Sequence, residues 1–191
     1  MVLSASAVSL VSVTVTVLMI AAMLYLVWGS LDSDIHSPSP GDEDRPEIGD
    51  AEDADWVLVS HGHDDHYGSA VEVAKQSGAT LVSNFEITVD AEEKGVDATE
   101  PMNIGGSVDV GTPTVHMTEA QHSSGGLGHQ AGFVVDWNGN RIYHAGDTAL
   151  MTEMRDVIGP HLEPDAAAVP IGDHFTMGAT QAAIAVEWLD V

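Results

Sequence analysis

The sequence contains no cysteine, and only five of its 191 residues are Lys or Arg. Without cysteine there are no disulfide bonds and no thiolate metal sites, so any bound metal must be held by His and carboxylate side chains. Against the few cations stand 30 Asp and Glu, which give a formal net charge of −25. Because such a surface repels phosphates, we expect no nucleic-acid partner.

The acidic residues are spread along the chain and alternate with apolar segments. A block of like charges is typical of a disordered tail, so this distribution instead favours a folded protein with an acidic surface. Two interpretations stay open: a halophilic surface of the kind that salt-loving organisms use, or an ordinary acidic protein. The length is sufficient for one domain with its own core.

The first 31 residues carry no charged side chain, and residues 8–28 are apolar apart from Ser and Thr. A helix of about 20 such residues spans a hydrocarbon core of roughly 30 Å, and Tyr25 and Trp28 are typical interfacial anchors. We therefore predict a single membrane span and a membrane-associated protein. Residues 7–17 also alternate and are β-branched, as in a strand, which leaves a cytoplasmic protein as the alternative.

The rest of the chain can be divided by its composition and by the period with which apolar residues recur. Residues 32–53 are rich in Pro, Gly, Asp and Glu and predict a solvated linker. Strands and helices alternate from residue 54, and after Gly106 the period of two indicates antiparallel strands. We predict three parts: the hydrophobic segment 1–31, the linker 32–53, and an α/β layered domain at 54–191.

Several single elements can be predicted inside that domain. The pair Asn138–Gly139 is typical of a tight β-hairpin turn. Gly78 predicts the end of a helix that covers residues 67–78. Further elements are a helix at 151–162, a buried strand at 165–172 and a final helix at 180–191.

The most informative motif is VLVSHGHDDHYG at residues 57–68, where a buried strand runs into a tight loop and then a helix. His61 and His63 are two residues apart on the loop, so both imidazoles can face one point. Asp65 and His66 follow at the entrance of the helix. These residue types are ligands for zinc and related ions, and this spacing can serve two ions side by side.

Two further candidate ligands stand where predicted strands end. His122 follows the strand at residues 114–120, and Asp147 lies in the segment IYHAGDT. Each alone is more often structural, as a surface His or as an Asp that caps a helix. Together with the first cluster, they predict a metal centre.

With these motifs the sequence resembles the metallo-β-lactamase superfamily, specifically its small branch of metal-dependent hydrolases, as an acidic member of haloarchaeal type. The resemblance runs from Asp55 to the end through NFEI, PMNIGGSV, HSS, AGFVV, IYHAGDT and PIGDHFTMG. It implies an αββα sandwich with one or two divalent ions, usually zinc, with Mn or Fe as alternatives. It also implies hydrolysis of a small-molecule substrate by a metal-bound hydroxide, without specifying the substrate.

The resemblance also implies a role for each candidate residue. His61, His63 and His122 correspond to the ligands of the first ion, Asp65 and His66 to ligands of the second, and Asp147 to the bridging carboxylate. Asp65 is in addition the candidate catalytic residue, because it could orient the attacking water or hold its proton. Three more residues are candidates to support the site or to contact substrate: His144, Asp173 and His174.

Two departures from the family pattern qualify these expectations. The family's opening strands and Gly-His-Ser turn are replaced here by the uncharged segment and the linker, and the chain stops at Val191 before the family's last His ligand. We therefore expect a sandwich incomplete at both ends and a weakened second metal site, for which His129, His144 and His174 are the candidate substitutes. The alternative to a hydrolase is a truncated or degenerate metal-binding remnant without catalysis. A homo-oligomer and a membrane-anchored interaction protein also stay open.

Overall fold

The computed structural model describes residues 51–191. The predicted membrane span at residues 8–28 and nearly all of the predicted linker lie outside this range, so the three-part division of the chain stays a prediction. Within residues 51–191, no helix is long and apolar enough to cross a membrane.

The first sheet is parallel, as the alternation of strands and helices predicts. Its strands follow one another in the order β1-β2-β3, and helices form the crossovers that parallel neighbours require. One crossover helix ends at Gly78, which adopts a left-handed φ of 75° and so confirms the predicted helix stop. The elements are β1 (Trp56–Leu58), α2 (Asp64–Tyr67), α3 (Ala70–Ser77), β2 (Thr80–Asn84), α4 (Phe85–Glu93) and β3 (Thr99–Met102).

The second sheet has the order β4-β5-β6-β7-β8, and its first four strands form the predicted antiparallel meander. The β6–β7 turn consists of Asn138 and Gly139, both with positive φ (55° and 82°), as tight hairpin turns of this type require. The strands are β4 (Ser107–Asp109), β5 (Thr114–Glu119), β6 (Ala131–Trp137), β7 (Asn140–His144) and β8 (Ala166–Ala168).

The strand predicted at residues 165–172 is shorter and more exposed than expected. Only β8 forms, and it pairs with β7 at the edge of the sheet, where Ala166 and Ala168 are exposed. The prediction of a buried strand was therefore wrong, because a short apolar run does not distinguish a central strand from an edge strand.

Two helices cover the outer face of the second sheet. They are η3 (Met154–Leu162) and α5 (Ala179–Leu189), which pack with Val134 and Tyr143 in one core cluster. η3 is a π-helix, and the bond from Glu163 N–H to the Ile158 carbonyl spans five residues, at 3.1 Å. The predicted helix is thus confirmed in position but has wider turns, and Pro160 inside it has no N–H to donate to an α-helical bond.

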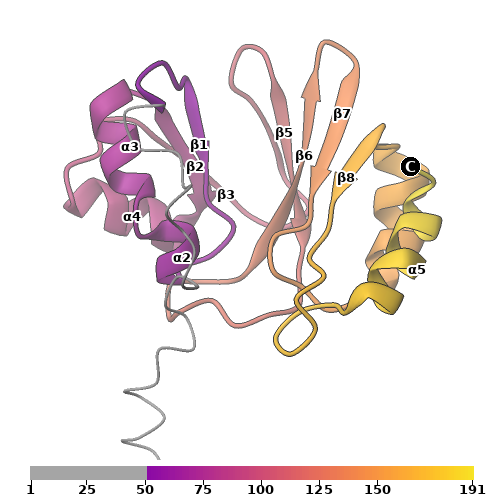
Figure 1. Cartoon of the computed structure of the whole chain (residues 1–191). Coiled ribbons are helices and arrows are strands. Elements are labelled where there is room, and N and C mark those ends of the chain that lie inside the picture. Colours follow the sequence, from indigo (N-terminus) through magenta and orange to yellow (C-terminus); the bar gives the residue numbers. More distant parts are fainter. Residues whose placement is uncertain (1–50) are drawn as a thin grey trace, which may run out of the picture. The chain divides into compact units, whose positions relative to one another are not determined.

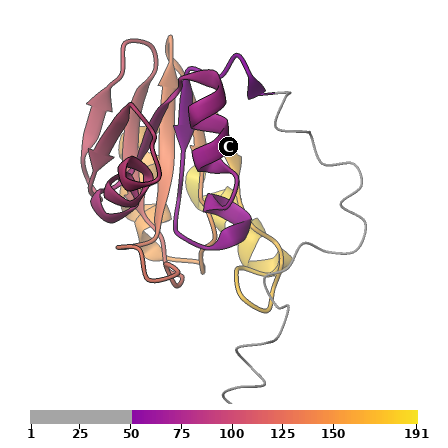
Figure 2. The ribbon, with the colours of Figure 1, turned by 90° about the vertical axis from the view of Figure 1, so that its left-hand side faces the viewer.

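The described residues form four layers, helix–sheet–sheet–helix (Figure 1). Helices α3 and α4 lie outside the first sheet, α5 lies outside the second, and Figure 2 views the stack from the α3 side. The sheets face each other through a cluster that includes Val82 and Met102 from the first sheet and Met117 and Phe133 from the second. This packing aligns the ends of β1, β5 and β7, which carry the candidate ligands.

Candidate metal centre

The six predicted ligands come from three segments, each of which follows a strand. His61, His63, Asp65 and His66 follow β1 and run into α2, His122 follows β5, and Asp147 follows β7. His63 is the N-cap of α2 and has an extended backbone. The packing of the two sheets therefore brings ligands together that are up to 86 residues apart, from His61 to Asp147.

Three imidazoles form the first cluster. Nε2 of His61 lies 2.8 Å from Nδ1 of His63, and the ring centroids of both lie 5.3 and 5.2 Å from that of His122. One nitrogen from each of the three residues lies within 4.8 Å of the others. Nε2 of His122 is buried and has no hydrogen-bond partner within the described chain. The predicted convergence of His61, His63 and His122 on a common point is confirmed.

The second cluster shares His61 and adds His66 and Asp147, again with ligand atoms within 4.8 Å of one another. Nε2 of His66 lies 3.5 Å from Oδ1 of Asp147 and 3.6 Å from Oδ2 of Asp65. The other oxygen of Asp147, Oδ2, lies 3.7 Å from Nε2 of His122 in the first cluster. One carboxylate thus faces both clusters, which is the geometry that a bridging ligand needs.

The protonation states of His61 and Asp147 favour ligation, whereas the metal-free state favours the protonated form of His66. Burial, together with the neighbouring His66 and His63, lowers the pKa of His61 to about 3, so this ring is neutral at pH 7. The contact with His66 lowers the pKa of Asp147, and the same contact raises the pKa of His66. A neutral imidazole and an ionised carboxylate are the forms that bind divalent ions.

Serine side chains hold the other nitrogen of three of these rings. Oγ of Ser60 lies 3.0 Å from Nδ1 of His61 and 3.4 Å from Nδ1 of His66, and Oγ of Ser123 lies 3.2 Å from Nε2 of His63. Outer partners of this kind fix the tautomer and orientation of metal-binding histidines. Ser60 is only 5% exposed, and its carbonyl accepts from Ala131 N–H on β6 at 3.0 Å. It therefore connects both clusters to the second sheet.

Sequence reasoning missed Ser60, Ser123 and Gln130. The Nε2 group of Gln130 donates to the backbone carbonyl of Asp147, so this side chain holds the loop that carries the shared carboxylate. The available signal was position alone, because Ser60 precedes His61 and Ser123 follows His122. The contacts of Ser123 and Gln130 depend on the approach of separate segments, whereas Ser60 contacts rings that are one and six residues away along the chain.

Gly62 allows that approach. Its N–H donates to the Ser124 carbonyl at 3.1 Å, and a Cβ there would lie 2.8 Å from the same oxygen. A side chain at this position would push the His61–His63 loop away from the segment that carries His122. The glycine between the two histidines is therefore a steric requirement of the first cluster.

The structure separates the three accessory candidates. His144 lines a cavity of about 350 Å³ together with Ser60, Asp65 and His66. Asp173 and His174 lie on an exposed loop and line neither this cavity nor the one beside His63 and His122. A role for His144 beside the second cluster stays a prediction, as does substrate contact by Asp173 and His174. His129, a candidate substitute ligand, lines the cavity beside the first cluster.

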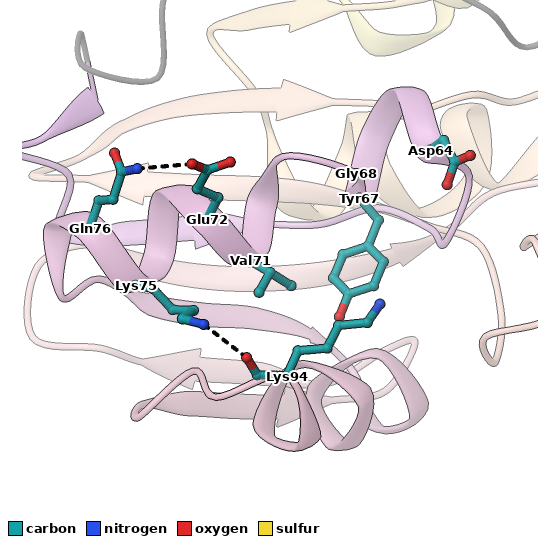
Figure 3. Close-up of a pocket in the computed structure, with 8 residues that line it drawn as sticks. All are labelled: Asp64, Tyr67, Gly68, Val71, Glu72, Lys75, Gln76 and Lys94. Atoms are coloured by element: carbon teal, nitrogen blue, oxygen red, sulfur yellow. Dashed lines mark hydrogen bonds between the residues drawn. The ribbon is translucent and has the colours of Figure 1, made fainter.

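Another cavity, of about 670 Å³, lies on the opposite side of α2 (Figure 3). Its polar groups are paired among themselves: Lys75 Nζ donates to the Lys94 carbonyl at 3.1 Å, and Gln76 Nε2 donates to Glu72 at 3.1 Å. Asp64 also lines it, but neither potential metal cluster of the described chain does. The candidate metal chemistry lies on the other side of the helix.

Comparisons with known proteins agree with this geometry. The family model described as "Beta-lactamase superfamily domain" matches residues 33–191. A UPF0173 metal-dependent hydrolase of Haloarcula marismortui is 44% identical over 170 residues, which cover 78% of this chain and 68% of the relative. Another from Methanopyrus kandleri is 46% identical over 149 residues, covering 74% and 64%.

Among solved structures, Igni18, a metallo hydrolase from Ignicoccus hospitalis, is similar with a TM-score of 0.67 and 37% identity. The match covers 72% of this chain and 60% of that one. The chain therefore spans about two thirds of the length of the relatives that it matches.

Proposed function

This chain belongs to the metallo-β-lactamase superfamily, and from that premise we propose that residues 54–191 act as a metal-dependent hydrolase domain. The observation that carries the proposal is the pair of clusters that share the buried His61, with Asp147 of the second cluster 3.7 Å from His122 of the first. The relatives named above are metal-dependent hydrolases, so the proposal assigns their general activity to this chain and leaves the substrate open.

His61 Nε2, His63 Nδ1 and His122 Nε2 are the proposed ligands of the first ion. A set of three imidazole nitrogens with an open fourth position is typical of catalytic zinc, so we propose zinc there. Nε2 of His122 supports this assignment, because it is buried without a hydrogen bond in the described chain and the nearest charged group is the carboxylate of Asp147 at 3.7 Å, itself a proposed metal ligand.

Asp65, His66 and Asp147 are the proposed ligands of the second ion. Asp147 takes the bridging position because its two oxygens face different clusters. Asp65 is the more exposed of the two carboxylates, with 36% of its side chain accessible against 26% for Asp147. That exposure suits a carboxylate that orients a water molecule or accepts its proton.

The bound ions would make two contributions to the chemistry. They would lower the pKa of a coordinated water to about 7, and they would polarise the bond that this water attacks. The protein's own side chains do the rest. Ser60 and Ser123 orient the rings of His61, His66 and His63, Asp147 stays ionised between the clusters, and Gln130 holds the loop that carries it.

Metal analysis combined with an ester substrate panel tests the proposal. The purified chain loaded with zinc should bind two ions and hydrolyse activated esters, and His122→Ala should lose the first ion and the activity. His161→Ala, which removes an exposed imidazole on η3, is the matched control and should change neither. One bound ion without turnover would instead support the alternative of a metal-binding remnant that catalyses nothing.

A further inference from the structure

A cavity of about 710 Å³ adjoins the first cluster, and the imidazoles of His63 and His122 form part of its wall. Most of the remaining wall comes from residues 119–130, a segment rich in Ser and Gly. This position places a bound molecule directly beside the proposed first metal ion.

The wall of this cavity contains one charged residue, Glu119 at the end of β5. None of the four Lys and Arg residues within 51–191 contributes to it. A second cavity of about 440 Å³ shares His129 with the first, and its wall holds the carboxylate of Glu86 but again no Lys or Arg. Within residues 51–191, no Lys or Arg side chain compensates these carboxylates for an anionic group that is bound away from the proposed metal ion.

The same wall contains polar atoms without partners. Gln130 is 3% exposed, and its Nε2 group donates to the Asp147 carbonyl. This bond orients the amide, and Oε1 of Gln130 is then buried without a hydrogen-bond donor in the described part of the chain. Nε2 of His129 is likewise buried without a hydrogen-bond partner there.

Apolar groups are exposed around the two cavities. Ile104 lines the first and is 39% exposed, and Phe85 lines the second and is 62% exposed. Pro101 and Met102 extend the apolar wall of the second cavity. Together they offer contact area to the non-polar part of a bound molecule.

Building on the hydrolase proposed above, we propose that the cavity at Glu119 binds the acyl part of an uncharged carboxylic ester and excludes substrates whose acyl end carries a negative charge. A carboxylate at the acyl end would lie near Glu119 without a neighbouring Lys or Arg, and this repulsion lowers the affinity. The net charge of −25 adds to the repulsion. The acyl chain lies against Ile104 and towards Phe85, and the ester group lies beside the first metal position.

A pair of esters matched in length and leaving group tests this proposal: 4-nitrophenyl hexanoate and the mono-4-nitrophenyl ester of adipic acid. After subtraction of spontaneous hydrolysis, kcat/KM of the zinc-loaded chain should be about tenfold or more in favour of the neutral ester. Glu119→Gln should reduce that ratio about threefold or more by improving adipate hydrolysis. Glu72→Gln removes the same charge from the cavity on the other side of α2 and should leave the ratio unchanged.

Added KCl tests the same proposal on the unaltered chain. Because salt screens the repulsion, the ratio of kcat/KM between the neutral and the charged ester should fall as the KCl concentration rises. Hydrolysis of both esters at similar rates, or a ratio that Glu119→Gln leaves unchanged, would overturn the charge selection while leaving the hydrolase intact. If the zinc-loaded chain hydrolyses neither of these two esters, this inference fails, and the proposed hydrolase fails with it only if the wider ester panel also shows no turnover.

Discussion

Helix α2 separates two groups of polar residues that are stabilised in different ways. On its outer side, Lys94 lies 2.7 Å from Asp90, which also accepts from Tyr67 at 2.7 Å, so opposite charges and hydrogen-bonding groups are paired. On its inner side, His61 lies among other imidazoles, with ring centroids 4.1 to 5.3 Å away.

The contrast shows where structure and function separate. The outer groups satisfy one another within the protein, so they stabilise the fold without needing a ligand. The inner groups are mostly of one kind, all able to donate an electron pair to a cation, and they gain full stabilisation only when one is bound. Substitutions on the inner side should therefore change metal binding and activity, whereas those on the outer side should change only stability.

Removal of the shared carboxylate should have the largest effect. Asp147→Ala takes away the carboxylate whose two oxygens face His66 in one cluster and His122 in the other. The second ion should therefore be lost, and kcat/KM should fall by more than about 100-fold, which exceeds the loss typical of outer partners. Asp64→Ala, on the outer side of the same helix, should retain both ions and the activity. Titration calorimetry with zinc and ester hydrolysis measure both effects. Two tight sites in Asp147→Ala would refute the bridging role.

Replacement of a single hydroxyl should distinguish positioning from packing. Ser60→Ala removes the partner of His61 and His66 and should weaken zinc binding about 10- to 100-fold, whereas Ser60→Thr should restore it. The matched control is Ser83→Ala, whose hydroxyl donates only to the Val59 carbonyl at 2.7 Å. That variant should lose about 1 kcal/mol of stability and keep its zinc affinity. Equal zinc affinities in the two Ala variants would exclude a special role for Ser60.

The pH dependence of stability should reveal the buried imidazole in the metal-free protein. The pKa of His61 in the folded protein is lowered from 6.5 to about 3. Between these two pH values, His61 is protonated in the unfolded chain and neutral in the folded chain. Its contribution to stability is therefore present above pH 6.5 and declines as the pH falls, by up to about 1.4 kcal/mol per pH unit. His61→Asn should make the slope of unfolding free energy between pH 6 and 4 shallower. Denaturant titrations at each pH measure this, and parallel slopes would contradict it.

The outer side should give the smallest effect. Lys94→Met breaks the ion pair with Asp90, in which the Lys94 side chain is half exposed. The substitution should therefore lower the free energy of unfolding by less than about 1 kcal/mol. Zinc binding and ester hydrolysis should stay at the level of the unaltered chain. A loss of metal affinity in this variant would mean that the two sides of α2 are coupled.

Local signals in the sequence were enough to predict much of the fold. The alternation of strands and helices, the Gly78 helix stop and the Asn138–Gly139 hairpin depend on neighbouring residues, and the structure agrees with each. The wider turns of η3 and the exposed edge position of β8 could not be predicted in the same way. Both depend on which surfaces pack against them.

The sequence alone was enough to predict the types of candidate ligand and the first half of the candidate centre, because His61, His63, Asp65 and His66 lie within six residues and share one loop and helix. It took the packing of the two sheets to show that His122 and Asp147 lie beside His61, and that Asp173 and His174 remain on an exposed loop. Backbone geometry sets distances between neighbours along the chain. Contacts between distant segments are instead set by how the two sheets pack, and a single sequence contains no local pattern for that.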